Sequence, residues 1–160
     1  MDEKTFEERI LLLEPKLYRT AYAILWNDAD VADAMQECIL KAWQKLGFLK
    51  DEERFEAWTA RILINACRDL QRRNKHNPLP LERDIGIEAV PQEDAADPGL
   101  REALHALPPK YRLPLLLHHM DGYTLAEIAP MLRVPVSTLK GRLYEARKQL
   151  KTLLEKEAVR

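Results

Sequence analysis

Two cationic stripes on predicted helices carry the side chains best suited to binding chemistry. In the first, Arg61, Asn65, Arg68 and Arg72 recur at steps of four, three and four, which places them on one helix face. Guanidinium groups pair with phosphates, and an asparagine amide can bond a base edge. The stripe suits a nucleic-acid strand, although alone it fits an ordinary solvated helix face better.

The second stripe lies in the segment VPVSTLKGRLYEARKQL, residues 134–150. Leu139, Leu143, Ala146 and Leu150 form an apolar side at helical spacing. The other sides of this predicted helix present Ser137, Thr138, Lys140, Arg142, Tyr144 and Lys148. Such a helix can enter the major groove of DNA and contact the flanking phosphates.

A predicted helix-turn-helix positions this second stripe. Thr124 stands three residues before Glu127, which predicts a capping box at the start of a short helix that ends near Leu132. Residues 133–135 form the turn into the cationic helix. A helical hairpin with a solvated basic face is the alternative, but the cap, the turn and the cations together favour DNA binding.

Enzymatic and metal chemistry find little support in the residues. His118 and His119 are adjacent, so their side chains point about 100° apart on a helix, and no Asp, Glu or Cys stands at supporting spacing. Cys38 and Cys67 lie far apart within helical patterns, which predicts buried free thiols. With no nucleophile and base pair and no glycine-rich phosphate loop, we expect no cofactor, no metal and no catalytic activity.

Helical periodicity dominates both ends of the chain, so the predicted fold class is all-α. Apolar residues from Phe6 to Leu25 recur at steps of three and four, and Pro15 is predicted to split them between two helices. Pro114 and Pro130 fall inside later helical patterns, where we expect local bends.

Two further helices are predicted in the first half of the chain. Asp28 or Asp30 is expected to cap one of them, and Gly47 is expected to end it. The other spans residues 55–75. Its predicted inward residues are Phe55, Trp58, Ile62, Ala66 and Leu70.

Charge divides the 160 residues into three parts. Lys and Arg number 13 against 14 Asp and Glu in residues 1–76, 1 against 6 in residues 77–98, and 11 against 6 in residues 99–160. The middle part is also rich in proline. We therefore predict two small helical domains, 1–76 and 99–160, joined by a flexible acidic linker.

These segments also carry a family resemblance. DADVADAMQECILKAWQKL and FEAWTARILINACRDLQRR resemble region two of an extracytoplasmic-function (ECF) sigma factor of bacterial RNA polymerase. LHALPPKYRLPLLLHHMDGYTLAEIAPMLRVPVSTLKGRLYEARKQL resembles region four. The resemblance implies a factor that binds core polymerase, directs it to promoters and helps open them. A stand-alone helix-turn-helix regulator is the alternative, but it leaves the first domain unexplained.

In region two the resemblance implies two surfaces. Asp33, Gln36, Glu37 and Lys41 match the helix that docks on the clamp helices of the polymerase β′ subunit. The loop 47–54 matches the part that melts the promoter and captures a flipped base of the minus-ten element. Candidates for that downstream contact are Phe48, Leu49, Lys50, Asp51, Arg61, Asn65, Arg68 and Arg72.

In region four the resemblance implies a reader of the minus-thirty-five element that also contacts the polymerase β flap. Lys140, Arg142 and Tyr144 occupy recognition-helix positions, and Arg133 stands where the family often has a turn glycine. The family also threads its linker through the polymerase, whereas acidic composition alone fits a mere tether. An anti-sigma factor, which can be membrane-bound, is a further expected partner.

The remaining expectation concerns the compartment. Nothing at the amino terminus resembles a signal peptide, and no apolar run approaches the roughly 20 residues of a membrane span. We therefore expect a cytoplasmic protein without membrane insertion.

Overall fold

A computed structural model describes residues 1–76 and 98–158 of the chain. The chain divides into two compact units, Met1–Ile87 and Glu88–Arg160, and each is described by itself. Within the described residues every element is a helix, and no strand is present. The all-α prediction is confirmed. The predicted acidic linker falls on residues 77–98, all but the last of which lie outside the described residues.

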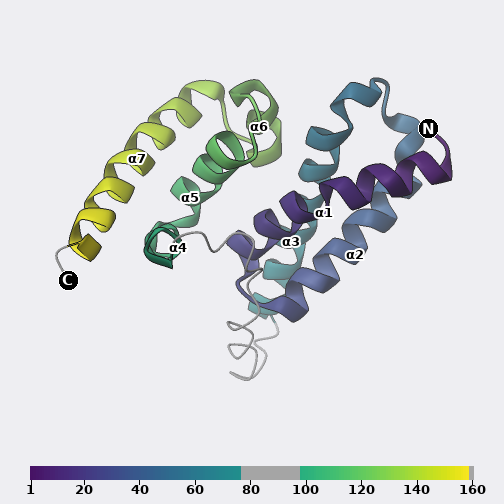
Figure 1. The fold of residues 1–160 in the computed structure, drawn as a ribbon. Coiled ribbons are helices and arrows are strands. Elements are labelled where there is room, and N and C mark those ends of the chain that lie inside the picture. The colour runs from purple at the N-terminus through teal and green to yellow at the C-terminus, as the bar shows by residue number, and fades with distance from the viewer. Residues whose placement is uncertain (77–97, 159–160) are drawn as a thin grey trace. The chain divides into compact units, whose positions relative to one another are not determined.

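Three long helices build the first unit (Figure 1). They are α1 (Glu3–Leu25), α2 (Asp28–Gln44) and α3 (Phe55–His76), and each contacts the other two. Their shared core includes Leu13, Leu17, Val31, Cys38, Phe55, Leu63, Ile64 and Cys67. Because all three helices bury an apolar side in one place, the outer faces of α2 and α3 are held in fixed positions for contact with partners.

The first unit corrects the predicted break at Pro15, because α1 runs through that residue. Proline lacks the N–H that would bond the carbonyl of Leu11, yet both residues are exposed, so water can satisfy that carbonyl. The apolar stripe then packs without interruption. Tertiary packing therefore outweighs the local cost of the proline.

The predicted capping residue of α2, Asp28 or Asp30, is also wrong. Asn27 caps the helix, and its side chain accepts a hydrogen bond from the Asp30 backbone N–H at 3.0 Å. Asp28 instead accepts from the Tyr18 hydroxyl at 2.5 Å, and the Asp30 side chain accepts from Asn74 at 3.3 Å. Both carboxylates tie α2 to its neighbours, which leaves the cap to the amide.

The prediction that Gly47 ends α2 is also wrong. Helix α2 ends at Gln44, and the chain continues through the 3-10 turns η1 (Leu46–Phe48) and η2 (Glu52–Arg54) into α3. Gly47 lies inside η1. The glycine therefore follows the helix end instead of making it.

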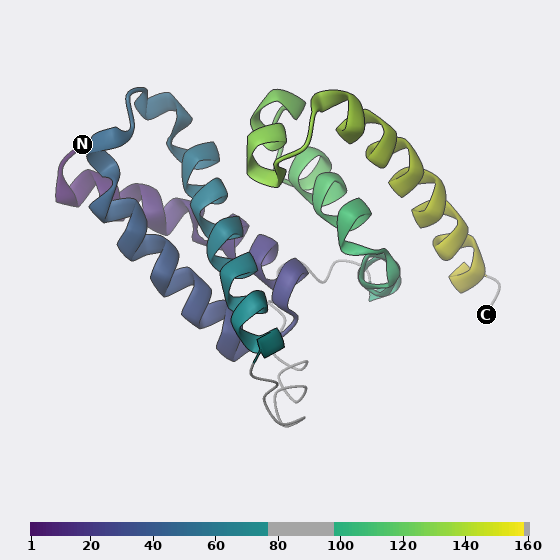
Figure 2. The ribbon, with the colours of Figure 1, turned by 180° about the vertical axis from the view of Figure 1, so that it is seen from behind.

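The second unit consists of α4 (Pro98–Ala106), α5 (Pro109–Leu115), α6 (Leu125–Leu132) and α7 (Val136–Ala158) (Figure 2). Its core includes Leu107, Leu115, Leu143 and Ala146, against which Leu104 and other half-buried apolar residues pack. The unit thus holds α7 by its apolar stripe, as the spacing of that stripe predicts.

Two prolines inside this unit have different surroundings. After the buried Pro114, α5 passes into a π-helical segment, η5 (Leu116–Met120), in which the Asp121 N–H bonds the Leu116 carbonyl at 3.1 Å. Pro130 lies within α6 without ending it. The irregularity predicted at Pro114 therefore takes the form of a widened helical turn, of a kind often found at functional sites.

A buried arginine joins α4 to α5. The Arg112 guanidinium donates to the carbonyls of Leu104, His105 and Leu107 at 3.0, 2.9 and 2.7 Å. These carbonyls lie at and just after the end of α4, where most carbonyls lack a backbone donor within the helix, although the Leu104 carbonyl also accepts from the Leu107 N–H at 3.2 Å. Burial lowers the pKa of Arg112, but a guanidinium keeps its charge at neutral pH.

Replacing Arg112 with methionine should therefore lower the unfolding free energy of the second unit by about 2–4 kcal/mol, since buried carbonyls lose charge-assisted partners. Trp26, Trp43 and Trp58 all lie in the first unit, so tryptophan fluorescence reports that unit alone. Urea unfolding should show an earlier transition by circular dichroism with an unchanged fluorescence midpoint. Lys110→Met on the same helix is the control, and an equal loss in both variants would contradict the prediction.

Candidate polymerase and nucleic-acid interfaces

The loop between α2 and α3 is tied down at one end and open at the other. The Arg9 guanidinium donates to the Glu52 carbonyl at 2.7 Å, and the Met1 amino group pairs with the Glu52 carboxylate at 3.1 Å. Arg9 also lies over the Phe55 ring, 4.7 Å from its centroid. Phe48, at the open end, is 80% exposed. An exposed aromatic ring on an anchored loop is a suitable platform for stacking an unpaired base.

The other predicted loop residues differ in their surroundings. Lys50 is exposed and Leu49 is half-buried. Asp51 accepts from the Glu53 backbone N–H at 3.0 Å and lies 3.8 Å from the Arg54 Nε. Because its carboxylate is used to shape the turn, Asp51 is a weaker candidate for bonding a base than Phe48 or Lys50.

The polar stripe on α3 does lie outside the buried core. Arg61 and Arg72 are exposed, whereas Asn65 and Arg68 are half-buried. Arg72 forms an ion pair with Asp69 of the same helix. The stripe thus forms a cationic face on α3, in which Arg72 is partly neutralised by Asp69.

The predicted docking residues on α2 fall into two groups. Asp33 and Gln36 are exposed. Glu37 is half-buried, and its carboxylate pairs with Lys41 at 3.0 Å and with Arg73 of α3 at 3.6 Å. Asp33 and Gln36 are therefore open to a partner, whereas Glu37 also joins α2 to α3 through Arg73, and Lys41 pairs with Glu37 within α2.

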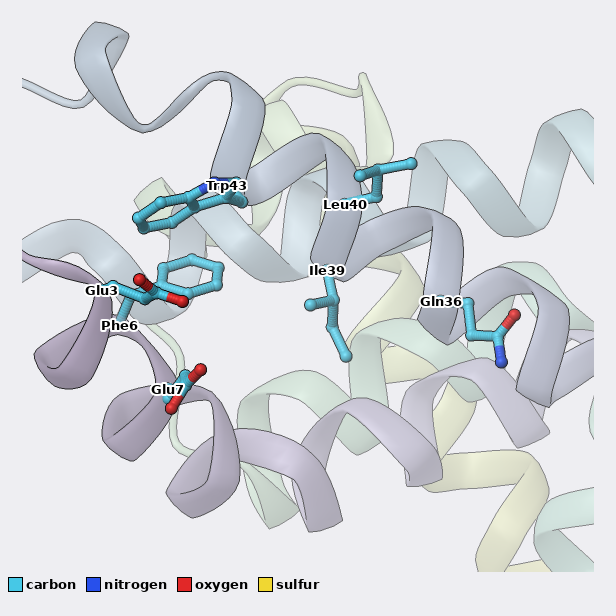
Figure 3. A pocket seen from close by; sticks show the side chains of 7 residues that line it. All are labelled: Glu3, Phe6, Glu7, Gln36, Ile39, Leu40 and Trp43. Atoms are coloured by element: carbon cyan, nitrogen blue, oxygen red, sulfur yellow. The ribbon is translucent and has the colours of Figure 1, made fainter.

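An apolar groove between α1 and α2 extends from Gln36 and was not predicted from the sequence. It has a volume of about 380 Å³ and is lined by Glu3, Phe6, Glu7, Gln36, Ile39, Leu40 and Trp43 (Figure 3). The centroids of the Phe6 and Trp43 rings lie 5.2 Å apart. Leu40 is 57% exposed and Trp43 is 44% exposed. Large apolar side chains that lie off the buried stripe of a helix were the available sequence signal.

The second unit contains the predicted helix-turn-helix. The Thr124 hydroxyl accepts from the Glu127 N–H at 3.1 Å, and the Glu127 carboxylate accepts from the Thr124 N–H at 2.9 Å, which completes the capping box. Arg133 ends α6 with a left-handed φ of 58°. This conformation favours glycine, in keeping with the turn glycine that the family resemblance implies at this position.

The recognition residues of α7 occupy two sides of the helix. Ser137, Lys140, Tyr144 and Lys148 are exposed. Thr138 and Arg142 are half-buried on a flank. The exposed four are available to a groove, while the Arg142 side chain must extend past its neighbours to reach a base edge.

The described residues offer no metal site and no reactive thiol. No group of three or more His, Cys, Asp or Glu side chains among them is placed to hold an ion. Cys38 and Cys67 are free and buried, as predicted, and burial raises the pKa of each to about 12. Both thiols are therefore protonated at neutral pH and chemically inert. None of the helices in residues 1–76 and 98–158 has the length and hydropathy to span a bilayer.

Comparison with known proteins decides the family. A family model of sigma-70 region 2 matches residues 10–77, and one of sigma-70 region 4 matches residues 99–150. The ECF RNA polymerase sigma factor SigM of Mycobacterium tuberculosis is 30% identical over 154 residues, which cover 96% of this chain and 79% of SigM. The chain belongs to the ECF sigma factors. RNA polymerase sigma factor SigV of Bacillus subtilis is 31% identical over 141 residues, covering 88% of this chain and 85% of SigV.

Solved structures agree with this assignment at the level of fold. The sigma factor RpoE of Bartonella quintana, in complex with the anti-sigma factor NepR, matches with a TM-score of 0.78 at 23% identity, over 95% of this chain and 98% of RpoE. CnrH, in complex with the cytosolic domain of CnrY, matches with a TM-score of 0.69 at 25% identity, over 96% of this chain and 90% of CnrH.

The family resemblance predicted from the sequence is thus confirmed. This ECF sigma factor binds core RNA polymerase and directs it to promoter DNA. A stand-alone helix-turn-helix regulator is not favoured, because the region-two match covers residues that such a regulator would not need.

Proposed function

We propose that the two units divide promoter recognition between them. The first unit docks on the β′ clamp helices through Asp33, Gln36 and Glu37 and captures the melted minus-ten strand with its loop. The second unit reads the minus-thirty-five duplex with α7 and contacts the β flap. The observation that supports this division most strongly is the exposed Phe48 on a loop anchored by Arg9, because a free aromatic ring suits single-stranded DNA.

The groove beside the docking residues belongs to the same proposed polymerase interface. Its walls combine the carboxylates of Glu3 and Glu7 with the apolar side chains of Leu40 and Trp43. A partner helix with apolar residues flanked by cations would complement these walls. Gln36 belongs both to the groove and to the predicted docking face, so the two form one continuous surface.

The domain boundaries, compartment and regulation complete the proposal. Residues 1–76 act as region two, residues 77–98 as an acidic linker and residues 99–160 as region four. The protein acts in the cytoplasm without a cofactor and without catalytic activity of its own. An anti-sigma factor that covers the polymerase-binding surfaces is a proposed partner, supported by the anti-sigma complexes of RpoE and CnrH.

This division predicts that the free protein binds duplex DNA weakly. Its net charge is only −1, so the general electrostatic attraction to phosphates is small. Fluorescence anisotropy at physiological salt should show weak binding with little preference between promoter and scrambled duplexes, and sequence preference should emerge once core polymerase is added. Nanomolar, sequence-specific binding by the free chain would favour a stand-alone regulator instead.

A further inference from the structure

A guanidinium and an imidazole meet on the surface of the second unit. The Arg147 Nε and Nη2 groups donate to His119 Nε2 at 3.0 and 2.7 Å. Arginine stays charged at physiological pH, so the ring nitrogen can accept these bonds only while it carries no proton. The contact therefore requires a neutral His119 whose proton is on Nδ1.

His119 belongs to the π-helical segment η5, whose backbone is closed by hydrogen bonds. The N–H of Asp121 bonds the Leu116 carbonyl, and the N–H of Tyr123 bonds the Leu117 carbonyl at 3.0 Å. His118 Nδ1 lies 2.9 Å from the Tyr123 carbonyl oxygen. Because this turn is closed by several bonds, the backbone of His119 has a defined position, from which its ring reaches Arg147 of α7.

Arg147 lies next to the cationic face of α7 but is not one of the predicted DNA contacts. It is exposed, and it stands three residues after Tyr144 and four before the exposed Lys151. Side chains at these spacings are neighbours on a helix surface. A guanidinium released from His119 can therefore extend the line of exposed α7 side chains that begins with Lys140 and Tyr144.

We propose that His119 controls Arg147 by its protonation state. Neutral His119 keeps the guanidinium on the protein, and protonated His119 releases it to contact a phosphate of duplex DNA, alongside the positive charge of the imidazolium itself. This inference rests on the proposed function of the second unit in binding duplex DNA. The site it assigns is an anion contact that opens as the pH falls.

The surroundings of the His119 ring favour its neutral form in the free protein. Partial burial, Arg147 and then His118 lower the pKa of His119 below its ordinary value. A DNA phosphate beside the pair would act in the opposite direction and raise that pKa. Binding of DNA and uptake of a proton would then strengthen each other reciprocally.

Several titratable groups on the surrounding elements have contacts of their own or lie inside the unit, while Glu102 and His105 of α4 and Arg133 after α6 are exposed. On α5, Arg112 bonds the carbonyls at the end of α4, and Lys110 lies over the Tyr111 ring. On α6, the Glu127 carboxylate bonds Thr124. Asp121, which follows η5, is buried. Arg147 is thus the group whose hydrogen bonds depend directly on the state of His119.

The first test measures binding of the full-length chain to a duplex promoter fragment at pH 7.5 and pH 5.5 over a range of salt concentrations. For the natural sequence, the affinity should rise as the pH falls, and the slope of log K against log salt should steepen by about 1 to 2. His119→Gln should remove this steepening, because an amide oxygen accepts from Arg147 at either pH. The control His105→Gln, which removes another exposed imidazole of the second unit on α4, should retain it. An equal response in the natural chain and in His119→Gln would overturn the inference.

The second test follows the His119 ring by NMR without DNA. The Arg147→Gln variant should bring the His119 pKa back toward about 6.5, the ordinary value for histidine. An unchanged titration would overturn the inference. The proposed function is tested separately, since it fails if the chain with core polymerase binds promoter duplex at neither pH. If promoter binding is retained but the pH response is the same in His119→Gln, only the inference fails.

Discussion

Core RNA polymerase should lose most of its affinity for the chain when Asp33→Lys and Gln36→Arg are combined on α2. Both positions are exposed, so the fold should survive, whereas two new cations at a docking surface repel a partner that complements the native residues. We expect the dissociation constant to rise about 100-fold or more, or about 3 kcal/mol. Pull-down with purified core polymerase measures the loss, and circular dichroism checks the helices.

Controls for this prediction come from the same unit. Glu8→Lys on α1 changes an exposed charge outside the proposed docking surface and should leave association intact. Glu37 requires a paired design, because its ion pair with Arg73 also joins α2 to α3. The swap Glu37→Arg with Arg73→Glu preserves that pair but reverses the charge at Glu37, so it should fold and still fail to bind. Association retained by both α2 variants would exclude this docking face.

The DNA-contact variants should fail at different steps of initiation. Arg142→Ala should weaken formation of the closed complex by about 1–3 kcal/mol if the guanidinium bonds a base edge, and by less if it bonds only phosphate. Phe48→Ala combined with Asn65→Ala should leave duplex engagement largely intact. Strand opening should fall instead, since each lost stacking contact costs about 1–3 kcal/mol. Permanganate reactivity of unpaired thymines measures that opening.

A pre-melted promoter separates these two defects. A bubble template supplies the open strand, so it should restore transcription to the Phe48 and Asn65 double variant. It should not restore transcription to the Arg142 variant, whose defect lies in binding the upstream duplex. Rescue of both variants, or of neither, would contradict the proposed division of labour.

Local chemistry was the part of the fold that the sequence predicted well. The capping box at Thr124 depends only on residues three apart, and the apolar stripe of α7 depends only on helical spacing, so both could be read directly. Arg133 shows the limit of this reading, because its left-handed φ is set by the geometry of the turn between two packed helices.

Features that depend on packing could not be read in the same way. Pro15 lies inside α1 because the apolar stripe around it is buried against two other helices, which local propensity does not include. Trp58 and Ile62 were expected inside and are only half-buried, while Leu63 and Ile64 are fully buried. Helix α3 contacts both α1 and α2, so its buried face is wider and rotated relative to a single stripe.

The candidate surfaces show the same difference between features set by helical spacing and features set by packing. Asp33, Gln36, Lys140 and Tyr144 were placed on exposed helix faces by spacing, and the structure keeps them exposed. The groove at Trp43 needs two helices, so the pattern of α2 alone did not predict it. The contact between His119 and Arg147 joins residues 28 apart in sequence, and helical spacing does not bring such a pair together.

Transcription in vitro tests the central assignment most directly. Purified core RNA polymerase is incubated with a library of promoter fragments, with and without this protein, and the transcripts are sequenced. The account predicts that specific start sites appear only when the protein is present and share upstream and downstream elements at a constant spacing. Transcript patterns that do not change when the protein is added, while the protein alone binds particular duplexes tightly, would contradict it.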